Sequence, residues 1–145
     1  MKNFISVYLD GDTKAAQTWG EKLKSHGYPT MLILSPKAEE ITRLPTGINV
    51  DSYVALMQKA RSSQIPVLKL ASQKKLTLDQ WRMLALYSWG QDPKSSSTKL
   101  FKRLYKKVPK ALAHERSRFL LLLLSSKSGG KNFRLSDKYK KELLK

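Results

Sequence analysis

The uneven placement of charge constrains this 145-residue chain most strongly. Residues 1–68 contain 8 Lys and Arg against 6 Asp and Glu, a net charge of +2. The residues from Lys69 onward contain 20 against 5, a net charge of +15. Because cationic side chains are almost never buried without partners, the second half has to fold with its charges outward. The pattern predicts a nearly neutral globular unit followed by a strongly basic region.

The overall composition indicates a folded protein with a polyanionic partner. Hydrophobic residues make up 41% of the chain and charged residues 27%, values typical of a soluble domain. A net charge of +17 favours nucleic acid, because clustered Lys and Arg displace counterions from phosphates. The absence of cysteine excludes disulfides and thiolate metal sites and favours a reducing compartment. The two histidines are too few for a typical zinc site.

No segment of the sequence predicts export or a membrane span. Asp10 and Asp12 interrupt the apolar N-terminal stretch too early for a signal peptide. The longest uninterrupted apolar run, residues 119–124, is far shorter than the bilayer requires. We therefore expect a cytoplasmic protein with no membrane partner.

The first half predicts an α/β fold, a small parallel sheet with flanking helices of Rossmann or Toprim-like type. Short apolar, β-favouring runs alternate with helical patterns, and Gly27 and Pro36 mark boundaries. Asp51 is the expected N-cap of the second helix, after a loop at residues 36–50. The expected strands are residues 4–9, 30–34 and 65–70, and the expected helices are residues 13–26 and 51–61. This order is typical of a parallel sheet within a domain of residues 1–72.

The second half, residues 73–145, predicts a basic α-helical region packed on the first domain. "TLDQ", residues 77–80, is a capping-box pattern that starts a helix running to about Trp89. Thr98 opens an amphipathic helix with an apolar stripe at residues 100, 101, 104, 105 and 108. A further helix carries "HERSRFLLLLL", residues 114–124, and a flexible stretch is expected near residues 125–132.

Two carboxylates stand together in "VYLDGDTKAA", residues 7–16. At the carboxyl end of a parallel strand, Asp10 and Asp12 would lie on one side of the strand at the edge where ligands bind. Carboxylate oxygens suit Mg²⁺, so a magnesium site is one interpretation. The other is structural: Asp-Gly-Asp forms a turn, and Asp12 is a natural N-cap for the helix that starts at Thr13.

Two segments carry a resemblance to a known family: "VYLDGDTKAAQTWGEKLKSHGYPTMLIL", residues 7–34, and "GINVDSYVALM", residues 47–57. Together they resemble the second half of a Toprim domain, as in bacterial and phage primases. Asp10 and Asp12 match the D-x-D motif of that family, and residues 51–54 match its later acidic segment. The resemblance covers roughly residues 4–70. It implies a Toprim-like sheet and Mg²⁺ at the aspartate pair.

The sequence also departs from the Toprim pattern. The family has an earlier strand and loop that carry a catalytic glutamate, and this chain starts at the D-x-D strand. Lys14 and Ala15 stand where the family usually has Ala-Gly. Without a complete catalytic set, the resemblance implies a truncated, non-catalytic relative, or a half-site that another protein completes. We therefore expect no enzyme activity and no required cofactor.

Cations in the second half are the candidate binding residues. Lys and Arg at successive turns of one helix face can follow a phosphate backbone. A solvated helix face is the ordinary alternative, but the chain has no acid between Lys94 and His114, so the charges of this helix repel one another. The candidate nucleic-acid-binding residues are Lys99, Lys102, Arg103, Lys106, Lys107, Lys110, Arg116, Arg118, Lys127, Lys131 and Arg134.

These patterns predict a non-catalytic accessory protein that binds the backbone of DNA or RNA through a basic helical face. A phage, plasmid or other mobile element would suit such a replication accessory. Two alternatives stay open at this stage. One is a Mg²⁺-dependent, Toprim-type primase or nuclease component that uses Asp10 and Asp12. The other is a basic adaptor or inhibitor that binds a larger nucleic-acid-processing protein.

Overall fold

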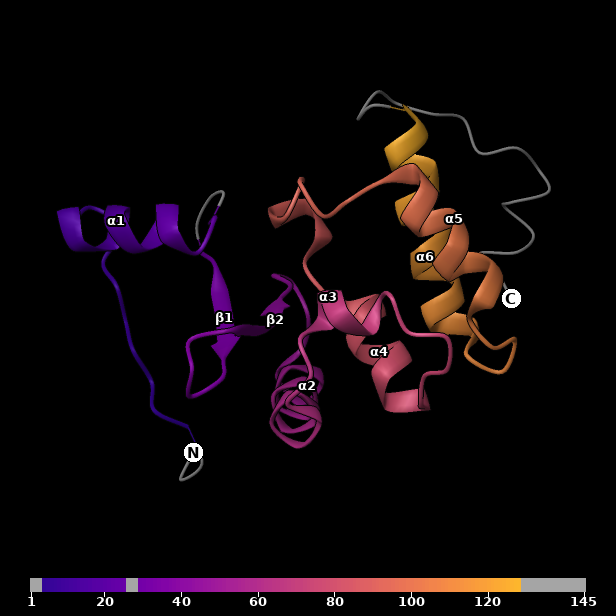
Figure 1. Cartoon of the computed structure of the whole chain (residues 1–145), viewed down its shortest axis with the longest axis horizontal. Coiled ribbons are helices and arrows are strands. Elements are labelled where there is room, and N and C mark those ends of the chain that lie inside the picture. The colour runs from indigo at the N-terminus through magenta and orange to yellow at the C-terminus, as the bar shows by residue number, and fades with distance from the viewer. Residues whose placement is uncertain (1–3, 26–28, 129–145) are drawn as a thin grey trace.

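Helices dominate the computed structural model, which describes residues 4–25 and 29–128 (Figure 1). A small sheet lies between the first helix and the others. The elements are α1 (Lys14–Lys22), β1 (Met31–Leu34), β2 (Glu40–Leu44), α2 (Val50–Ser63), α3 (Val67–Leu70), α4 (Leu78–Leu86), a 3₁₀ turn (Trp89–Gln91), α5 (Thr98–Lys107) and α6 (Ala113–Ser128).

The predicted parallel sheet of a Rossmann or Toprim-like fold is wrong. The described residues contain one two-stranded sheet, and β1 and β2 pair antiparallel with Met31 opposite Leu44 and Ile33 opposite Thr42. A tight turn joins the strands. In it the Ser35 hydroxyl accepts hydrogen bonds from the backbone N–H groups of Lys37 and Glu39. A connection this short can only reverse the chain, so the two strands run in opposite directions.

Two of the three predicted strands are not strands. Residues 4–9 are extended but pair with no strand, and most of their side chains are exposed. Residues 67–70 form α3, in which Val67 and Leu70 are buried while Leu68 is exposed. Apolar residues three apart share one face of a helix, whereas a strand would place them on opposite faces. The run at 65–70 therefore has a helical arrangement in the structure, although one turn of sequence is too short to distinguish it from a strand.

The second strand, β2, falls inside the predicted loop at 36–50. This strand was not predicted because it contains Arg43, and a charged residue is rarely buried in a strand. Here Arg43 is 1% exposed, and its guanidinium nitrogens donate to both carboxylate oxygens of Glu40 and to the carbonyls of Leu23, Lys24 and Gln91. Burial by itself would lower the pKa of Arg43. The hydrogen bonds and negative charge of Glu40, together with the charges of Tyr87 and Asp92, outweigh burial, so the pKa of Arg43 is raised.

Local signals set several helix boundaries. Thr77 and Gln80 form the predicted capping box at the start of α4, with both reciprocal hydrogen bonds present. The start of α2 differs from the prediction, since Asn49 rather than Asp51 is its N-cap. α6 extends through Ser128 into the stretch predicted to be flexible, and the rest of that stretch lies outside the described residues.

One hydrophobic core joins the two halves of the sequence. It extends from Ile33 in the sheet to Leu123 in α6. Its aromatic centre consists of Tyr87, Trp89 and Phe101, whose rings meet edge to face with centroids 4.7 Å and 5.4 Å apart. Because Phe101 belongs to α5, this packing fixes the basic helix on the rest of the protein.

Candidate nucleic-acid interface

α5 is anchored by its apolar side. The Ser97 hydroxyl accepts a hydrogen bond from the Leu100 backbone N–H at 3.2 Å and so caps the first turn. Phe101, Leu104 and Val108 are buried, as the predicted apolar stripe requires. α6 packs along α5, and the two helices lie side by side (Figure 1). The sequence pattern therefore determines which side of α5 meets water.

The opposite side of α5 is cationic and exposed. One helical turn advances about 5.4 Å, so cations three or four residues apart form a row along the axis. Lys110 follows in the turn after Pro109 and is also exposed. We call this set the α5 cationic face: Lys99, Lys102, Arg103, Lys106, Lys107 and Lys110.

Neighbouring acids do not neutralise this face. The sequence has no Asp or Glu between Asp92 and Glu115. Asp92 is buried, where it accepts a hydrogen bond from the Tyr87 hydroxyl at 2.9 Å. Glu115 is mostly buried and lies 3.6 Å from the Arg82 guanidinium. The nearest acids in the sequence are thus engaged elsewhere.

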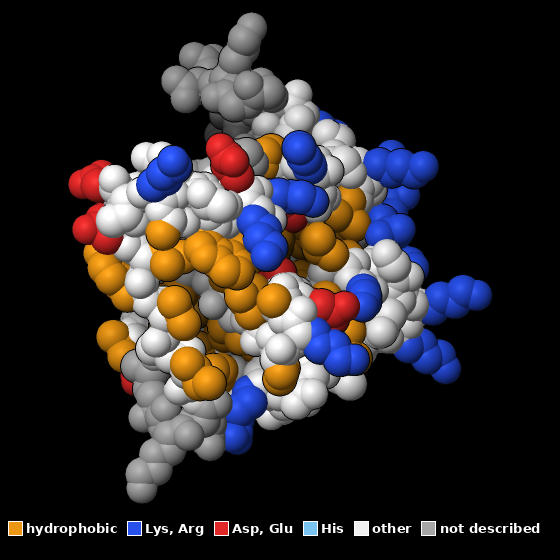
Figure 2. All heavy atoms as spheres, turned by 60° about the vertical axis from the view of Figure 1, so that its left-hand side comes forward, with side chains coloured by type: hydrophobic (Ala, Val, Ile, Leu, Met, Phe, Trp, Pro, Cys, Tyr) orange, Lys and Arg blue, Asp and Glu red, His pale blue; other side chains and the backbone are white. Residues whose placement is uncertain are grey.

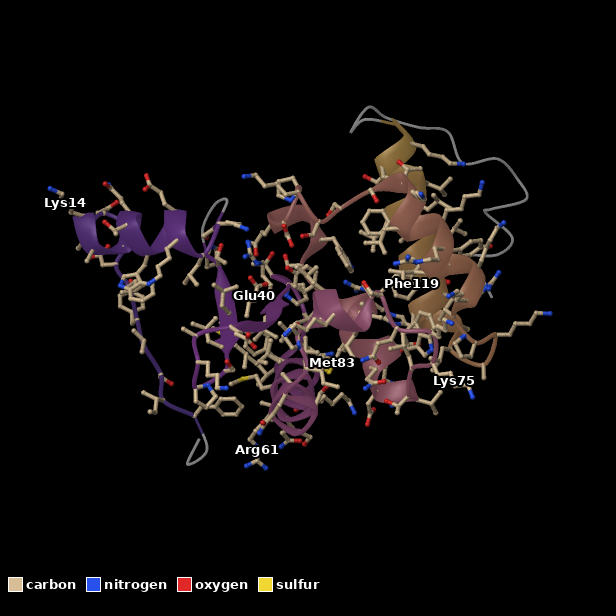
Figure 3. All side chains as sticks on the ribbon, in the orientation of Figure 1. Lys14, Glu40, Arg61, Lys75, Met83 and Phe119 are labelled. Carbon is tan, nitrogen blue, oxygen red and sulfur yellow. The ribbon has the colours of Figure 1, made fainter. Side chains whose placement is uncertain are left out.

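The loop after α3 adds two lysines that were not among the predicted binding residues. The Arg103 guanidinium donates to the Ala71 carbonyl at 2.7 Å, which holds the end of α3 against α5. The exposed Lys74 and Lys75 follow within four residues. Figure 3 shows Lys75 on the same half of the molecule as α5 and α6. The adjacent lysines before the capping box were visible in the sequence, but the Arg103 contact that joins the end of α3 to α5 was not.

Two predicted binding residues donate to carbonyls within the protein. Arg116 stacks on the Tyr105 ring, 4.3 Å from its centroid, and donates to the Tyr105 carbonyl at 3.2 Å. Arg118 donates to the Ala85 carbonyl at 3.0 Å. Burial lowers the pKa of Arg118, and the charge of Glu115 opposes that shift. Both partly buried arginines therefore use donors to hold α6 against its neighbours, Arg116 against α5 and Arg118 against α4.

The remaining candidates lie beyond α5. The Thr98 hydroxyl contacts the Ser126 carbonyl at 3.4 Å, so the end of α6 meets the start of α5. Lys127 is exposed at that junction. Lys131 and Arg134 lie outside the described residues.

Asp10 and Asp12 form a turn ahead of α1. The Asp10 carboxylate accepts the Asp12 backbone N–H at 3.1 Å, and the Asp10 carbonyl accepts both the backbone N–H and the hydroxyl of Thr13. Thr13, rather than Asp12, is the N-cap of α1, since its hydroxyl accepts the Ala16 N–H. In residues 4–25 and 29–128, no three or more His, Cys, Asp or Glu gather into a group that could hold a metal.

The described helices include none that is both long and apolar enough to cross a membrane. Comparison with protein families, curated proteins and solved structures found no match to this chain.

Proposed function

We propose that this protein is a non-catalytic accessory protein that binds the phosphate backbone of DNA or RNA. The contact surface is the α5 cationic face, extended by Lys74 and Lys75. One observation carries the proposal: a helix fixed in the core by Phe101 and Leu104 presents a row of exposed cations with no acid among them. Such a row repels itself unless a polyanion covers it.

The chemistry of this surface suits contact with the phosphate backbone of a nucleic acid rather than with the edges of its bases. Lysine acts as a point charge toward phosphate and carries no sequence information there. Trp81, Trp89, Phe101 and Phe119 are buried and so do not provide stacking platforms for bases. Arg116 already stacks on the ring of Tyr105. We therefore propose binding with little sequence preference. A cysteine-free chain suits a reducing compartment, and we propose a cytoplasmic location.

The salt dependence of binding tests the proposal. Each phosphate contact contributes about 0.9 to the slope of log affinity against log salt on duplex DNA. Replacing three cations together, by Lys99→Gln, Lys102→Gln and Lys106→Gln, should make that negative slope shallower by about 2 to 3 if each contacts one phosphate. The measurement is fluorescence anisotropy of random-sequence oligonucleotides over a salt series. Parallel arms with single-stranded DNA, duplex DNA and RNA identify the preferred polymer.

A matched variant separates a local contact from the effect of net charge. Lys14→Gln, Lys22→Gln and Lys37→Gln remove the same charge from exposed positions in the first half of the chain. Lys14 and Lys75 lie at opposite ends of the molecule in Figure 3. This control should keep nearly the wild-type slope. Equal losses in both variants, or no loss in the α5 variant, would show that the face does not make the contact.

A further inference from the structure

The N-terminal segment exposes apolar side chains that proteins normally bury. Phe4 packs against the core, and the chain from there to α1 runs as an extended trace (Figure 1). Along it Ile5, Val7 and Tyr8 are 95%, 76% and 89% exposed. Its composition of aromatic and β-branched residues is typical of strands. Isolated apolar residues at a surface are ordinary, but a continuous run of this kind marks an interaction site.

More apolar residues occupy the same part of the molecule. Trp19 on α1 and Met31 and Leu34 on β1 are exposed large hydrophobics. Figure 2 turns the side of the molecule that carries α1 and β1 toward the viewer, and hydrophobic side chains gather on it. We call the whole set the apolar N-terminal surface: Ile5, Val7, Tyr8, Leu9, Trp19, Met31 and Leu34.

The sheet has one covered edge and one open edge. Beyond β2, the Ser88 backbone N–H donates to the Arg43 carbonyl at 3.0 Å, so this edge is occupied. Ile41 and Leu44 of β2 are also buried. β1 pairs only with β2 among the described residues, and its pattern of exposure is that of an edge strand. An unpaired strand edge is a template for another strand.

We propose that the apolar N-terminal surface is a homodimer interface, in which residues 5–9 of each copy pair with the β1 edge of the other. One chain carries both parts of this contact: a β-favouring segment without a sheet, and a sheet edge without a third strand. A two-fold axis satisfies both parts in both copies at once. Addition of an extended segment to an open edge is an established mode of strand recognition.

The available area suits a stable dimer. A specific protein interface buries about 800 Å² on each partner. The apolar N-terminal surface contributes seven large side chains with exposed fractions between 37% and 95%. An aromatic side chain buries about 150–250 Å² when it is fully covered, so seven partly exposed large side chains together offer an area of the required order.

Charge selects this side of the molecule for self-association. Residues 1–68 have a net charge of +2, whereas the rest of the chain has +15. Two copies that meet through their second halves would bring the α5 cationic faces together and repel. Two copies that meet through their first halves avoid that repulsion.

Sedimentation velocity over a concentration series tests the dimer. Salt is kept high, so that repulsion between the basic halves is screened. Wild type should show a discrete species of twice the 16.6 kDa chain mass. The double variant Ile5→Glu, Val7→Glu should raise the dimer dissociation constant at least tenfold, because it buries charge in the interface. Both positions are exposed in the monomer, so the fold of the single chain should be unaffected. Ser6→Pro, which removes a backbone N–H donor, should act in the same direction.

The control is Leu78→Glu at the start of α4, another exposed apolar position, 55% exposed and outside this surface. It should dimerise like wild type. A wild-type protein that stays monomeric at every concentration overturns the inference, and so does a double variant that dimerises unchanged. Far-UV circular dichroism of each variant confirms that the helices are retained. Because no α5 residue is altered, these results are independent of the proposed nucleic-acid contact.

Discussion

Arg43 is the residue that connects the N-terminal helix to the core. Its guanidinium donates to the carbonyls of Leu23 and Lys24 after α1, to the carbonyl of Gln91 at the end of the 3₁₀ turn, and to the Glu40 carboxylate in its own strand. Three segments distant in sequence thus meet at one buried cation. An arginine has five N–H donors, and this arrangement uses every one of them.

Removing this cation should be strongly destabilising. Arg43→Met leaves Glu40 without its ion-pair partner and three carbonyls without their donor, a loss we expect to lower the free energy of unfolding by about 3–5 kcal/mol. Urea denaturation measures it. Arg61→Met provides the matched control, because Arg61 is exposed and points away from the molecule in Figure 3. The control should change stability by less than about 0.5 kcal/mol, and similar losses in both variants would contradict the role of Arg43.

Tyr87 makes the stability depend on alkaline pH. Its hydroxyl lies 2.9 Å from a carboxylate oxygen of Glu40 and 2.9 Å from one of Asp92. Burial, followed by the charge of Glu40, raises the pKa of Tyr87 far above its ordinary value. A raised pKa means that the native state keeps the phenol proton where the unfolded chain, with a tyrosine pKa of about 10, releases it. This contribution to stability is complete below pH about 10 and is lost as the pH rises further.

The urea midpoint should therefore fall as the pH rises above about 10. Tyr87→Phe should remove that part of the fall, since no phenol is left to titrate. If the Tyr87→Phe midpoint falls as steeply as that of wild type, Tyr87 is not the group responsible.

At the scale of elements, the sequence predicted those whose signals are local. The 3.6-residue apolar period of α5 and the capping box of α4 depend on residues within one or two turns, and both predictions are confirmed. β1 also lies where an apolar run predicted a strand. For these elements, local pattern and tertiary packing favour the same structure.

The elements that were mispredicted depend on partners distant in sequence. β2 contains a buried arginine that is tolerated because α1 and the 3₁₀ turn supply carbonyls. Residues 4–9 have strand composition but lie unpaired. α3 occupies one turn, which is too short for its apolar period to distinguish a helix from a strand.

The same distinction holds for the candidate site. The cations of α5 could be read from helical spacing alone, and the structure places them on one exposed face. The inward position of Arg116 and Arg118 depends on carbonyls of Tyr105 and Ala85, which no local pattern shows. The hydrogen bond from Arg103 that joins the end of α3, shortly before Lys74 and Lys75, to α5 is likewise not shown by any local pattern.

For the whole molecule, a single core supports two surfaces of different chemistry. The apolar N-terminal surface lies in the nearly neutral half of the sequence, and the α5 cationic face lies in the half with a net charge of +15. The core between them includes residues from both halves. This division allows a second copy and a polyanion to bind at the same time without competing for residues.

Lysine footprinting tests the central claim most directly. The wild-type protein is acetylated with and without saturating nucleic acid, and the reactivity of each lysine is read by mass spectrometry. The account predicts that Lys74, Lys75, Lys99, Lys102, Lys106, Lys107 and Lys110 lose reactivity in the complex, while Lys14, Lys22 and Lys37 keep theirs. Protection centred on the first half of the chain, or no protection of the α5 lysines, would contradict it.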